Sequence, residues 1–297
     1  MLYGKYEVIS KLSYGWSDDQ KYVVCDMKED RYLLRRGSLS RKKQAYEEFR
    51  LIQRSYEIGL PVQEPIAVYE NIDEHILDRI YQWIDGAMLE DVLAKLDQHR
   101  QFELGMTAGS ILKSIHALNY EGVDLDWGTY YRERVYKKLN AYLHCGIKLK
   151  QEDLFLSWIR EFDCLLNSRP LVHQHGDYHP GNMILSEKEV LYIIDFDRHS
   201  IGDPWEEFNR IVWSAKKSSY FASGQIKAYF EDEIPEDFFR LLKYYFTVNA
   251  LGSVPWAIKF GQKEIDVMIE QAQTILSWYP DPSQITPNWF IFSIESD

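Results

Sequence analysis

The sequence predicts an α+β fold in two parts: a small antiparallel β-sheet with one helix, and a larger, mostly helical part. Three observations carry this prediction. Short β-type runs separated by turn residues fill much of residues 6–83, helical apolar spacing dominates after Gly86, and one polar stretch at 171–203 interrupts the helices. The 297-residue chain is 15% aromatic, so it can bury a core in one or two domains.

The first part, residues 1–84, contains five predicted strands. Apolar and β-branched residues place them at 6–9, 21–25, 32–35, 65–69 and 76–83. A charged stretch with apolar residues at helical spacing predicts one helix at 40–58, between the third and fourth strands. Gly59 and Pro61 follow this helix, which is typical of a helix C-terminus.

The second part, residues 85–297, begins at a predicted hinge, Asp85-Gly86. Apolar periodicity predicts helices at 88–97, 101–119, 131–145 and 151–167, and several more from 204 on. The stretch at 171–203 has no such periodicity and contains Gly, Pro, His and Asp. It therefore stands out as the candidate site.

Composition limits the class of protein. The chain has 46 acidic and 34 basic residues, a net charge of −12, which disfavours binding to a nucleic-acid backbone. No apolar run approaches the roughly 20 residues that span a bilayer, and the start has no signal-peptide pattern. Cys25, Cys145 and Cys164 are too few and too widely spaced for a disulfide framework or zinc site. We therefore expect a cytoplasmic protein with neither nucleic acid nor membrane as partner.

The candidate chemistry begins at 175–182, where the sequence reads HGDYHPGN. Asp177 and Asn182 stand five positions apart, and an apolar run at 190–194 then ends in Asp195. Carboxylate and amide oxygens are ligands that Mg²⁺ prefers, and phosphoryl transfer needs such a set beside the incoming hydroxyl. The spacing of Asp177 and Asn182 is that of the protein-kinase catalytic loop. In the alternative interpretation, both residues only cap turns.

On these motifs, with IDFD at 194–197 and GDP at 202–204, the chain resembles the aminoglycoside phosphotransferase family, small-molecule kinases with a two-lobed protein-kinase-like fold. The resemblance implies a nucleotide-binding N-lobe at 1–84 and, at 85–297, a C-lobe with the catalytic loop and acceptor site. It also implies Mg²⁺ as cofactor and ATP or GTP as phosphate donor.

The resemblance assigns roles to single residues. Asp177 matches the catalytic aspartate, which orients the acceptor hydroxyl and takes its proton late. Asn182 and Asp195 match the Mg²⁺ ligands. Structural or metal-adjacent roles fall to His175, Asp197 and Asp203.

The nucleotide contacts are expected in the first part of the chain. Arg35 on the third strand stands where family members usually have lysine, and Glu48 of the helix is its expected partner. Arginine keeps the charge but presents a fork rather than a point. The bulk of Tyr81 beside the base predicts that GTP serves as well as ATP or better. The expected nucleotide-binding residues are Ser17 in a phosphate-covering loop, Arg35, Glu48, and the hinge residues Tyr81, Gln82 and Trp83.

The acceptor is less defined by the sequence. The acidic excess of residues 85–297 indicates either a solvated surface or a cleft that attracts a cationic small molecule. An aminoglycoside-like antibiotic is the first prediction. The alternatives are a metabolic small-molecule kinase of the choline, homoserine or amino-sugar type, and a pseudokinase that binds without chemistry. The oligomeric state is not predicted.

Overall fold

The computed structural model describes residues 2–12, 19–120, 122 and 124–293. The chain packs into two compact units. Unit 1 comprises Met1–Val92 and His175–His199, and unit 2 comprises Leu93–Gln174 and Ser200–Asp297. This division differs from the predicted lobes, because the segment with the catalytic motif packs with the sheet and not with the helices.

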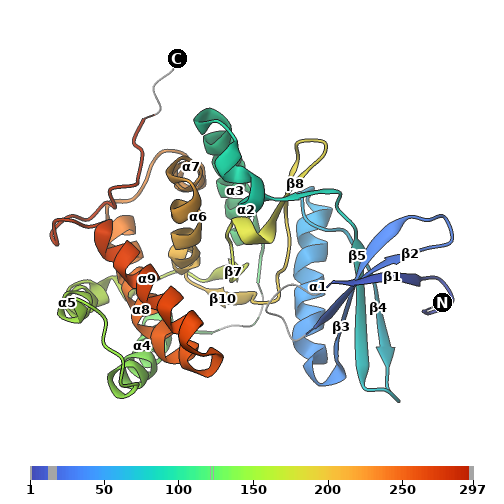
Figure 1. The fold of residues 1–297 in the computed structure, drawn as a ribbon, viewed down its shortest axis with the longest axis horizontal. Helices are drawn as coiled ribbons and strands as arrows, with labels where there is room; N and C mark the ends of the chain where they lie inside the picture. Colours follow the sequence, from blue (N-terminus) through green and yellow to red (C-terminus); the bar gives the residue numbers. More distant parts are fainter. Residues whose placement is uncertain (1, 13–18, 121, 123, 294–297) are drawn as a thin grey trace. The chain divides into compact units, whose positions relative to one another are not determined.

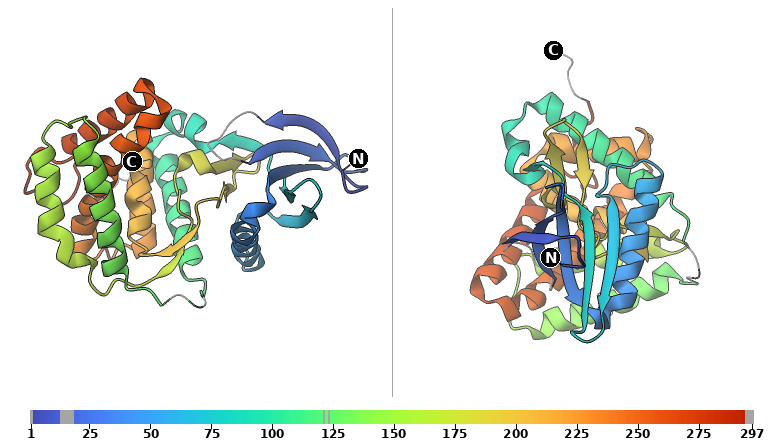
Figure 2. Two further views of the ribbon diagram at one scale, coloured as in Figure 1. Left: turned by 90° about the horizontal axis from the view of Figure 1, so that it is seen from below. Right: turned by 90° about the vertical axis from the view of Figure 1, so that its right-hand side faces the viewer.

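A five-stranded antiparallel sheet forms the centre of unit 1, in the order β1-β2-β3-β5-β4 (Figure 1). Its strands are β1 (Glu7–Leu12), β2 (Gln20–Cys25), β3 (Arg31–Ser38), β4 (Pro65–Asn71) and β5 (Ile76–Gln82). A long helix of this unit, α1 (Lys42–Glu57), runs along one face of the sheet (Figure 2). Sheet and helix confirm the predicted α+β fold class.

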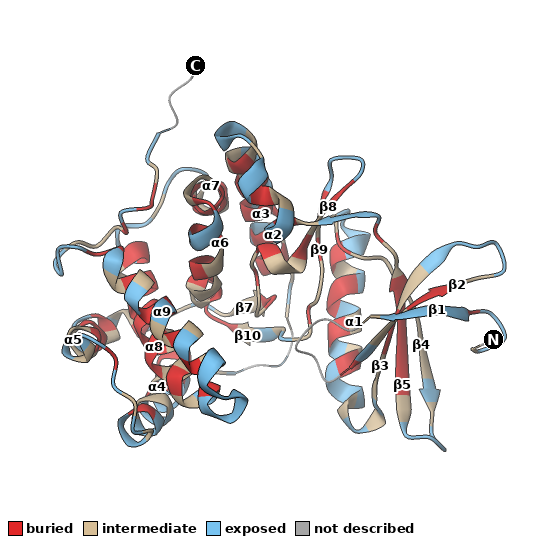
Figure 3. Cartoon of the chain, in the orientation of Figure 1, coloured by how far each residue is buried: buried red, intermediate tan, exposed pale blue. Residues whose placement is uncertain are grey.

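The two faces of the sheet differ in chemistry. Because side chains alternate along a strand, one face carries a small apolar core of Tyr6, Val24, Leu34 and Ile80. The opposite face carries the charged pair Arg35 and Arg79, which are register partners on β3 and β5. This face meets the buried stripe of α1, whose outer side is exposed (Figure 3). The stripe comprises Ala45, Glu48, Leu51, Ile52 and Ser55.

The segment His175–His199 joins unit 1 through backbone pairing. Three short strands form a second antiparallel sheet in the order β6-β8-β9: β6 (Gly86–Met88), β8 (Met183–Ser186) and β9 (Leu191–Ile193). The N–H of Ile193 also donates to the carbonyl oxygen of Pro61 at 2.9 Å. These bonds explain why the segment belongs with the sheet.

Unit 2 is mostly helical. Its helices are α3 (Gln98–His116), α4 (Trp127–His144), α5 (Glu152–Phe162), α6 (Ile211–Lys217), α7 (Ser219–Phe230), α8 (Glu236–Ala257) and α9 (Gln262–Ser277). Carboxylate caps start two of them, because Asp97 accepts from the N–H of Arg100 and Asp126 from that of Thr129. Helix α8 is buried along most of its length and packs against α4, α5 and α9. None of the helices in the described residues is both long and apolar enough to span a membrane.

Some elements differ from the sequence prediction. The helix predicted at 88–97 consists of α2 (Leu89–Val92) and a 3₁₀ turn, Leu93–Lys95. Four short strands were not predicted: β6, β8, and the pair β7 (Val172–Gln174) and β10 (Ser200–Gly202). Strands of three or four residues are too short to leave a readable alternation.

Candidate active site

The buried imidazole of His175 organises the catalytic loop. Its Nδ1 accepts a hydrogen bond from the N–H of Asp177 at 3.2 Å, and its Nε2 donates to the carbonyl oxygen of Ile194 at 3.0 Å. This pair of bonds requires the neutral tautomer with its proton on Nε2. His175 thus ties the loop to the residue that precedes Asp195.

Asp177 is held through its backbone. Its carbonyl oxygen accepts from Nδ2 of Asn182 at 2.9 Å, so the loop closes over five residues. The Asp177 carboxylate is 20% exposed and lies 3.7 Å from Nε2 of His179 and 3.8 Å from Nε of Arg198. Each oxygen of a carboxylate can accept more than one hydrogen bond, so this partly exposed group can also accept one from an incoming hydroxyl.

Asn182 and Asp195 lie at the same end of the β8–β9 hairpin. Met183 and Ile193 are register partners, and the N–H of Ile194 donates to the carbonyl oxygen of Asn182 at 3.0 Å. Asp195 follows with a φ of 63°, in the left-handed region that few residues other than glycine adopt. Residues held in this region cluster at functional sites.

Arg35 belongs to a closed, buried ring of charges. Its guanidinium contacts Glu48 Oε1 at 3.1 Å and Asp19 Oδ2 at 3.4 Å, and Arg79 contacts the same two carboxylates from the other side. The four side chains are between 1% and 4% exposed. Removing one partner from such a buried group leaves an uncompensated charge, which costs about 3–5 kcal/mol. The ring therefore fixes Arg35 to both α1 and β5.

The metal-ligand candidate Asp195 faces two cations. Its Oδ1 lies 3.0 Å from Nη1 of Arg35, and its Oδ2 lies 3.0 Å from Nζ of Lys21. Burial alone would raise the pKa of Asp195, but the charges of Arg35 and Lys21 outweigh it and lower the pKa to about 2. The carboxylate is therefore ionised at neutral pH.

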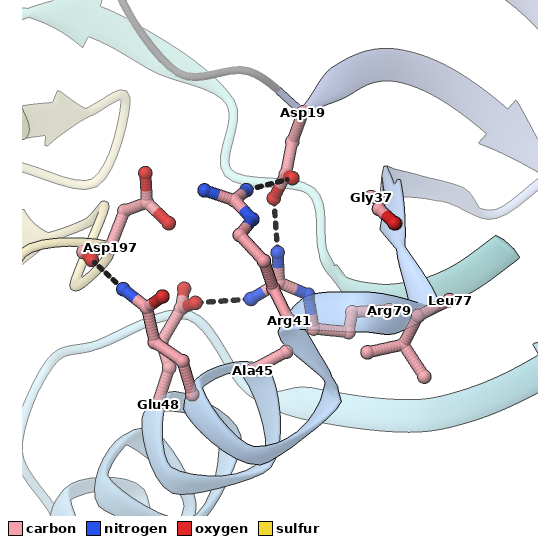
Figure 4. A pocket seen from close by; sticks show the side chains of 10 residues that line it. Asp19, Gly37, Arg41, Ala45, Glu48, Leu77, Arg79 and Asp197 are labelled. Atoms are coloured by element: carbon pink, nitrogen blue, oxygen red, sulfur yellow. Dashed lines mark hydrogen bonds and ion pairs between the residues drawn. The ribbon is translucent and has the colours of Figure 1, made fainter. Parts of the chain in front are cut away.

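A narrow pocket is lined by residues of the buried ring of charges and by Asp197 (Figure 4). Arg41 and Arg79 both point to Asp19 there, Glu48 meets Arg79, and Gln44 Nε2 donates to the backbone oxygen of Asp197 at 3.2 Å. Its free volume is about 10 Å³, room for about one water molecule. The charged side chains fill the pocket, so it is a support for the site and not a nucleotide cavity.

The donor set fits a hard divalent cation. Asn182 offers an amide oxygen and Asp195 a carboxylate, and the described part of the chain contains no group of three His, Cys, Asp or Glu placed as metal ligands. Two protein oxygens suit Mg²⁺, which keeps several waters and takes its other ligands from phosphates.

The predicted hinge is engaged within unit 1. Tyr81 is buried and packs 5.8 Å from the ring of Phe49, and burial raises its pKa. The N–H of Gln82 donates to the backbone carbonyl oxygen of Glu64, and the carbonyl oxygen of Gln82 accepts from Nε2 of Gln63 at 3.1 Å. The indole of Trp83 donates to Asp85 at 3.1 Å. Ser17 and most of its predicted loop lie outside the described residues.

Asp203 belongs to unit 2 and anchors its chain segment there. It is fully buried and accepts from Nε and Nη2 of Arg169, both at 2.9 Å, and from the hydroxyl of Tyr245 at 2.6 Å. The Arg169 guanidinium also stacks 3.7 Å from the centre of the Trp205 ring. These contacts hold Asp203 within unit 2, and its structural role stays a prediction.

Sequence reasoning missed three residues of the site: Asp19, Lys21 and Arg79. A signal for Arg79 exists, because the Asp78-Arg79 pair stands between the apolar residues at 76–77 and 80–81 of β5. Charges inside a buried strand need internal partners. Asp78 turns to the other face and pairs with Arg36 at 2.6 Å. Lys21 and Asp19 gave no comparable signal.

Comparisons with known proteins identify a family and a shared fold. A profile described as the phosphotransferase enzyme family matches residues 8–241. Amicoumacin kinase hAmiN, solved with AMP-PNP, Ca²⁺ and Ami, is similar with a TM-score of 0.65 and 17% identity, covering 95% of this chain and 91% of that one. No curated protein matches the chain.

Two further solved structures show the same fold. A variant of aminoglycoside 2'-phosphotransferase-IIIa with GDP has a TM-score of 0.68 and 15% identity over 94% of this chain and 95% of that one. A variant of aminoglycoside phosphotransferase APH(4)-Ia, solved with ADP and hygromycin B, has a TM-score of 0.64 and 14% identity over 91% and 93%. At these identities the likeness shows the fold alone.

Proposed function

Because this chain belongs to the phosphotransferase enzyme family, we propose that it moves the γ-phosphate of ATP or GTP to a hydroxyl of an aminoglycoside-like antibiotic, with Mg²⁺ as cofactor. Phosphoryl transfer to a hydroxyl group is the activity of the family and of its kinase neighbours. The observation that carries the proposal is the grouping of Asp177, Asn182 and Asp195 in one compact unit with Arg35.

The residues divide the reaction among them. Asp177 aligns the acceptor hydroxyl and takes its proton, as the new bond from oxygen to phosphorus forms and the bond to the leaving diphosphate breaks. Asn182 and Asp195 would hold Mg²⁺, which neutralises phosphate charge when bound. Arg35, braced by Glu48, adds positive charge beside the phosphates. No covalent enzyme intermediate is needed.

The remaining assignments concern the donor and the loop. Tyr81, Gln82, Trp83 and Ser17 are proposed to surround the nucleotide. His175 and Asp197 position the loop and the metal ligands. Because Tyr81 is bulky and fixed by packing against Phe49, it would narrow an adenine pocket, which supports testing GTP beside ATP.

The acceptor proposal rests on chemistry and on the neighbours. Structures of two neighbours were solved with an antibiotic bound, hygromycin B in one and gentamicin in the other. The net charge of −12 supports a cationic acceptor. A metabolic hydroxyl compound remains the second candidate, and the location of the enzyme in the cytosol is part of the proposal.

The test is a coupled assay of nucleoside diphosphate release. Mg²⁺ with ATP or GTP is offered with aminoglycosides, macrolides, choline, homoserine and amino sugars. We expect acceptor-dependent release that falls about 10²–10⁴-fold in Asp177→Ala, because positioned acid–base groups contribute that much. Nucleotide affinity should persist, since the backbone of Asp177 and not its carboxylate closes the loop onto Asn182.

A matched variant, Asp73→Ala, removes an exposed carboxylate in the turn between β4 and β5 and should leave turnover unchanged. Turnover near the wild-type value in Asp177→Ala would contradict the assignment. Turnover only with a metabolic acceptor would replace the antibiotic by the second candidate.

A further inference from the structure

Two cations lie side by side on the sheet face that meets Asp195. Lys21 on β2 and Arg35 on β3 are register partners, so their side chains leave the sheet on the same side. Lys21 reaches Asp195 Oδ2 and Arg35 reaches Asp195 Oδ1, each at 3.0 Å. The site therefore holds two positive groups where a nucleotide-binding kinase needs one beside the phosphates.

Arg35 is poorly placed to move toward a nucleotide. Its Nη1 contacts Glu48 and Asp195, and its Nη2 contacts Asp19 and Asp197 at 3.4 Å. Glu48 and Asp19 are in turn bound by Arg79, which closes the ring. Displacing the guanidinium would leave buried carboxylates with less compensation. Arg35 is thus held in place between Glu48 of α1 and Asp195.

Lys21 has the opposite character. Among the described residues Asp195 is its one ion-pair partner, and its side chain is 15% exposed against 4% for Arg35. An ammonium on a flexible four-carbon stem can exchange one oxygen partner for another with little rearrangement. Lys21 also stands at the start of β2, directly after the loop that the sequence predicts to cover the phosphates.

We propose that Lys21 is the cation that binds the phosphates of the donor nucleotide, while Arg35 is the fixed residue that positions Asp195. This inference rests on the proposed function and refines it, because the direct contact with the phosphates passes from Arg35 to Lys21. When the nucleotide binds, the Lys21 ammonium exchanges Asp195 Oδ2 for a phosphate oxygen. That exchange leaves the carboxylate oxygen available to a metal ion. The phosphate-binding role that a lysine on the third strand usually has would then belong to a lysine on the second.

The test compares Lys21→Met with Lys28→Met, which removes the same charge from an exposed turn at the other end of β2. Calorimetry measures affinity for Mg²⁺ with ATP or GTP and, separately, for the matching nucleoside. A hydrogen bond between charged groups is lost in Lys21→Met, so its triphosphate affinity should fall about 10–100-fold. Nucleoside affinity should not change, and Lys28→Met should behave as wild type. Lys21→Arg should recover part of the lost affinity.

The melting temperature shows whether Lys21→Met is folded, so that a loss of affinity is not mistaken for unfolding. We expect this variant to melt close to wild type, because Arg35 still pairs with Asp195. Unchanged triphosphate affinity in folded Lys21→Met would overturn the inference, as would an equal loss of nucleoside affinity. Wild-type protein that binds no nucleoside triphosphate would instead overturn the proposed function, and the inference with it.

Discussion

At the scale of single residues, an arginine at position 35 can contact several carboxylates at once. A guanidinium presents five donors in a rigid fork, and here the fork contacts Asp19, Glu48, Asp195 and Asp197. Burial alone would lower the pKa of Arg35, but Glu48 and Asp195 raise it above the ordinary value. Arg79 supplies a second positive charge, which contacts Asp19 and Glu48.

Gly176 is the second residue on which the site depends. Its φ is +83°, and a Cβ at this position would lie 1.9 Å from the carbonyl oxygen of Arg198. Both features favour glycine, since left-handed backbone strains other residues and a backbone oxygen cannot move aside easily. The catalytic loop can therefore pass close to residue 198 only without a side chain here.

We predict that Gly176→Ala lowers the free energy of unfolding by about 2–5 kcal/mol, the sum of backbone strain and steric overlap. Turnover should fall as well, because the loop carries Asp177. Gly59→Ala is the matched control, since Gly59 has a φ of +84° but nothing within 4 Å of its Cβ position. It should lose only the strain, about 1–2 kcal/mol. Equal denaturant midpoints for the two variants would refute the prediction.

At the scale of elements, α3 and α7 approach each other through glycines. A Cβ at Gly109 would lie 2.2 Å from the backbone oxygen of Gln225, and one at Gly105 would lie 2.1 Å from that of Phe221. Gly224 on α7 faces α3 in the same way, with the oxygen of Phe102 at 2.5 Å. The two backbones thus come into direct contact, which larger residues would prevent.

Gly109→Ala is expected to destabilise the protein by about 1–3 kcal/mol, because overpacking forces the two helices apart. Intrinsic helix propensity alone would favour alanine by about 1 kcal/mol. Gly252→Ala on α8 separates these effects, since the three atoms nearest to its Cβ position are methylenes of the flexible Lys138 side chain and not backbone atoms. That control should be neutral or slightly stabilising in chemical denaturation. A stabilised Gly109→Ala would show that the helices are not in contact as described.

At the scale of the whole molecule, the proposed nucleotide and metal sites belong to one of the two compact units. Every proposed nucleotide and metal residue among the described residues lies in unit 1, including those of the segment His175–His199. This segment carries five acidic and two basic residues, so part of the acidic excess predicted for the helical lobe belongs to unit 1. The charge argument for a cationic acceptor therefore concerns the catalytic segment as much as the helices.

Hydrogen exchange tests this division. Addition of Mg²⁺ with ATP or GTP should slow amide exchange in β2, β3 and the segment His175–His199, because ligand contacts stabilise the elements that make them. The α3–α7 pair of unit 2 should exchange as before. Mg²⁺ with inorganic phosphate serves as the control and should change neither region. Protection confined to unit 2 would place the nucleotide elsewhere.

The sequence alone was sufficient for the fold class and for the residues whose chemistry is local. Alternation in the first five strands and the periodicity of α1 each lie within one short segment, and Asp177 and Asn182 are only five positions apart. Arg35 and Glu48 were paired by the resemblance, and their side chains are in contact. The catalytic and ligand roles of these residues stay predictions.

Tertiary structure decided which side chains surround the residues of the candidate site. Asp19 and Arg79 join Arg35 because strand register places β2, β3 and β5 next to one another. Lys21 meets Asp195 across 174 positions of sequence. The segment His175–His199 joined the sheet unit because β8 pairs with β6 and Ile193 bonds to Pro61. Periodicity and motif spacing report on neighbours along one segment, whereas ion pairs between distant strands depend on how the whole sheet is ordered.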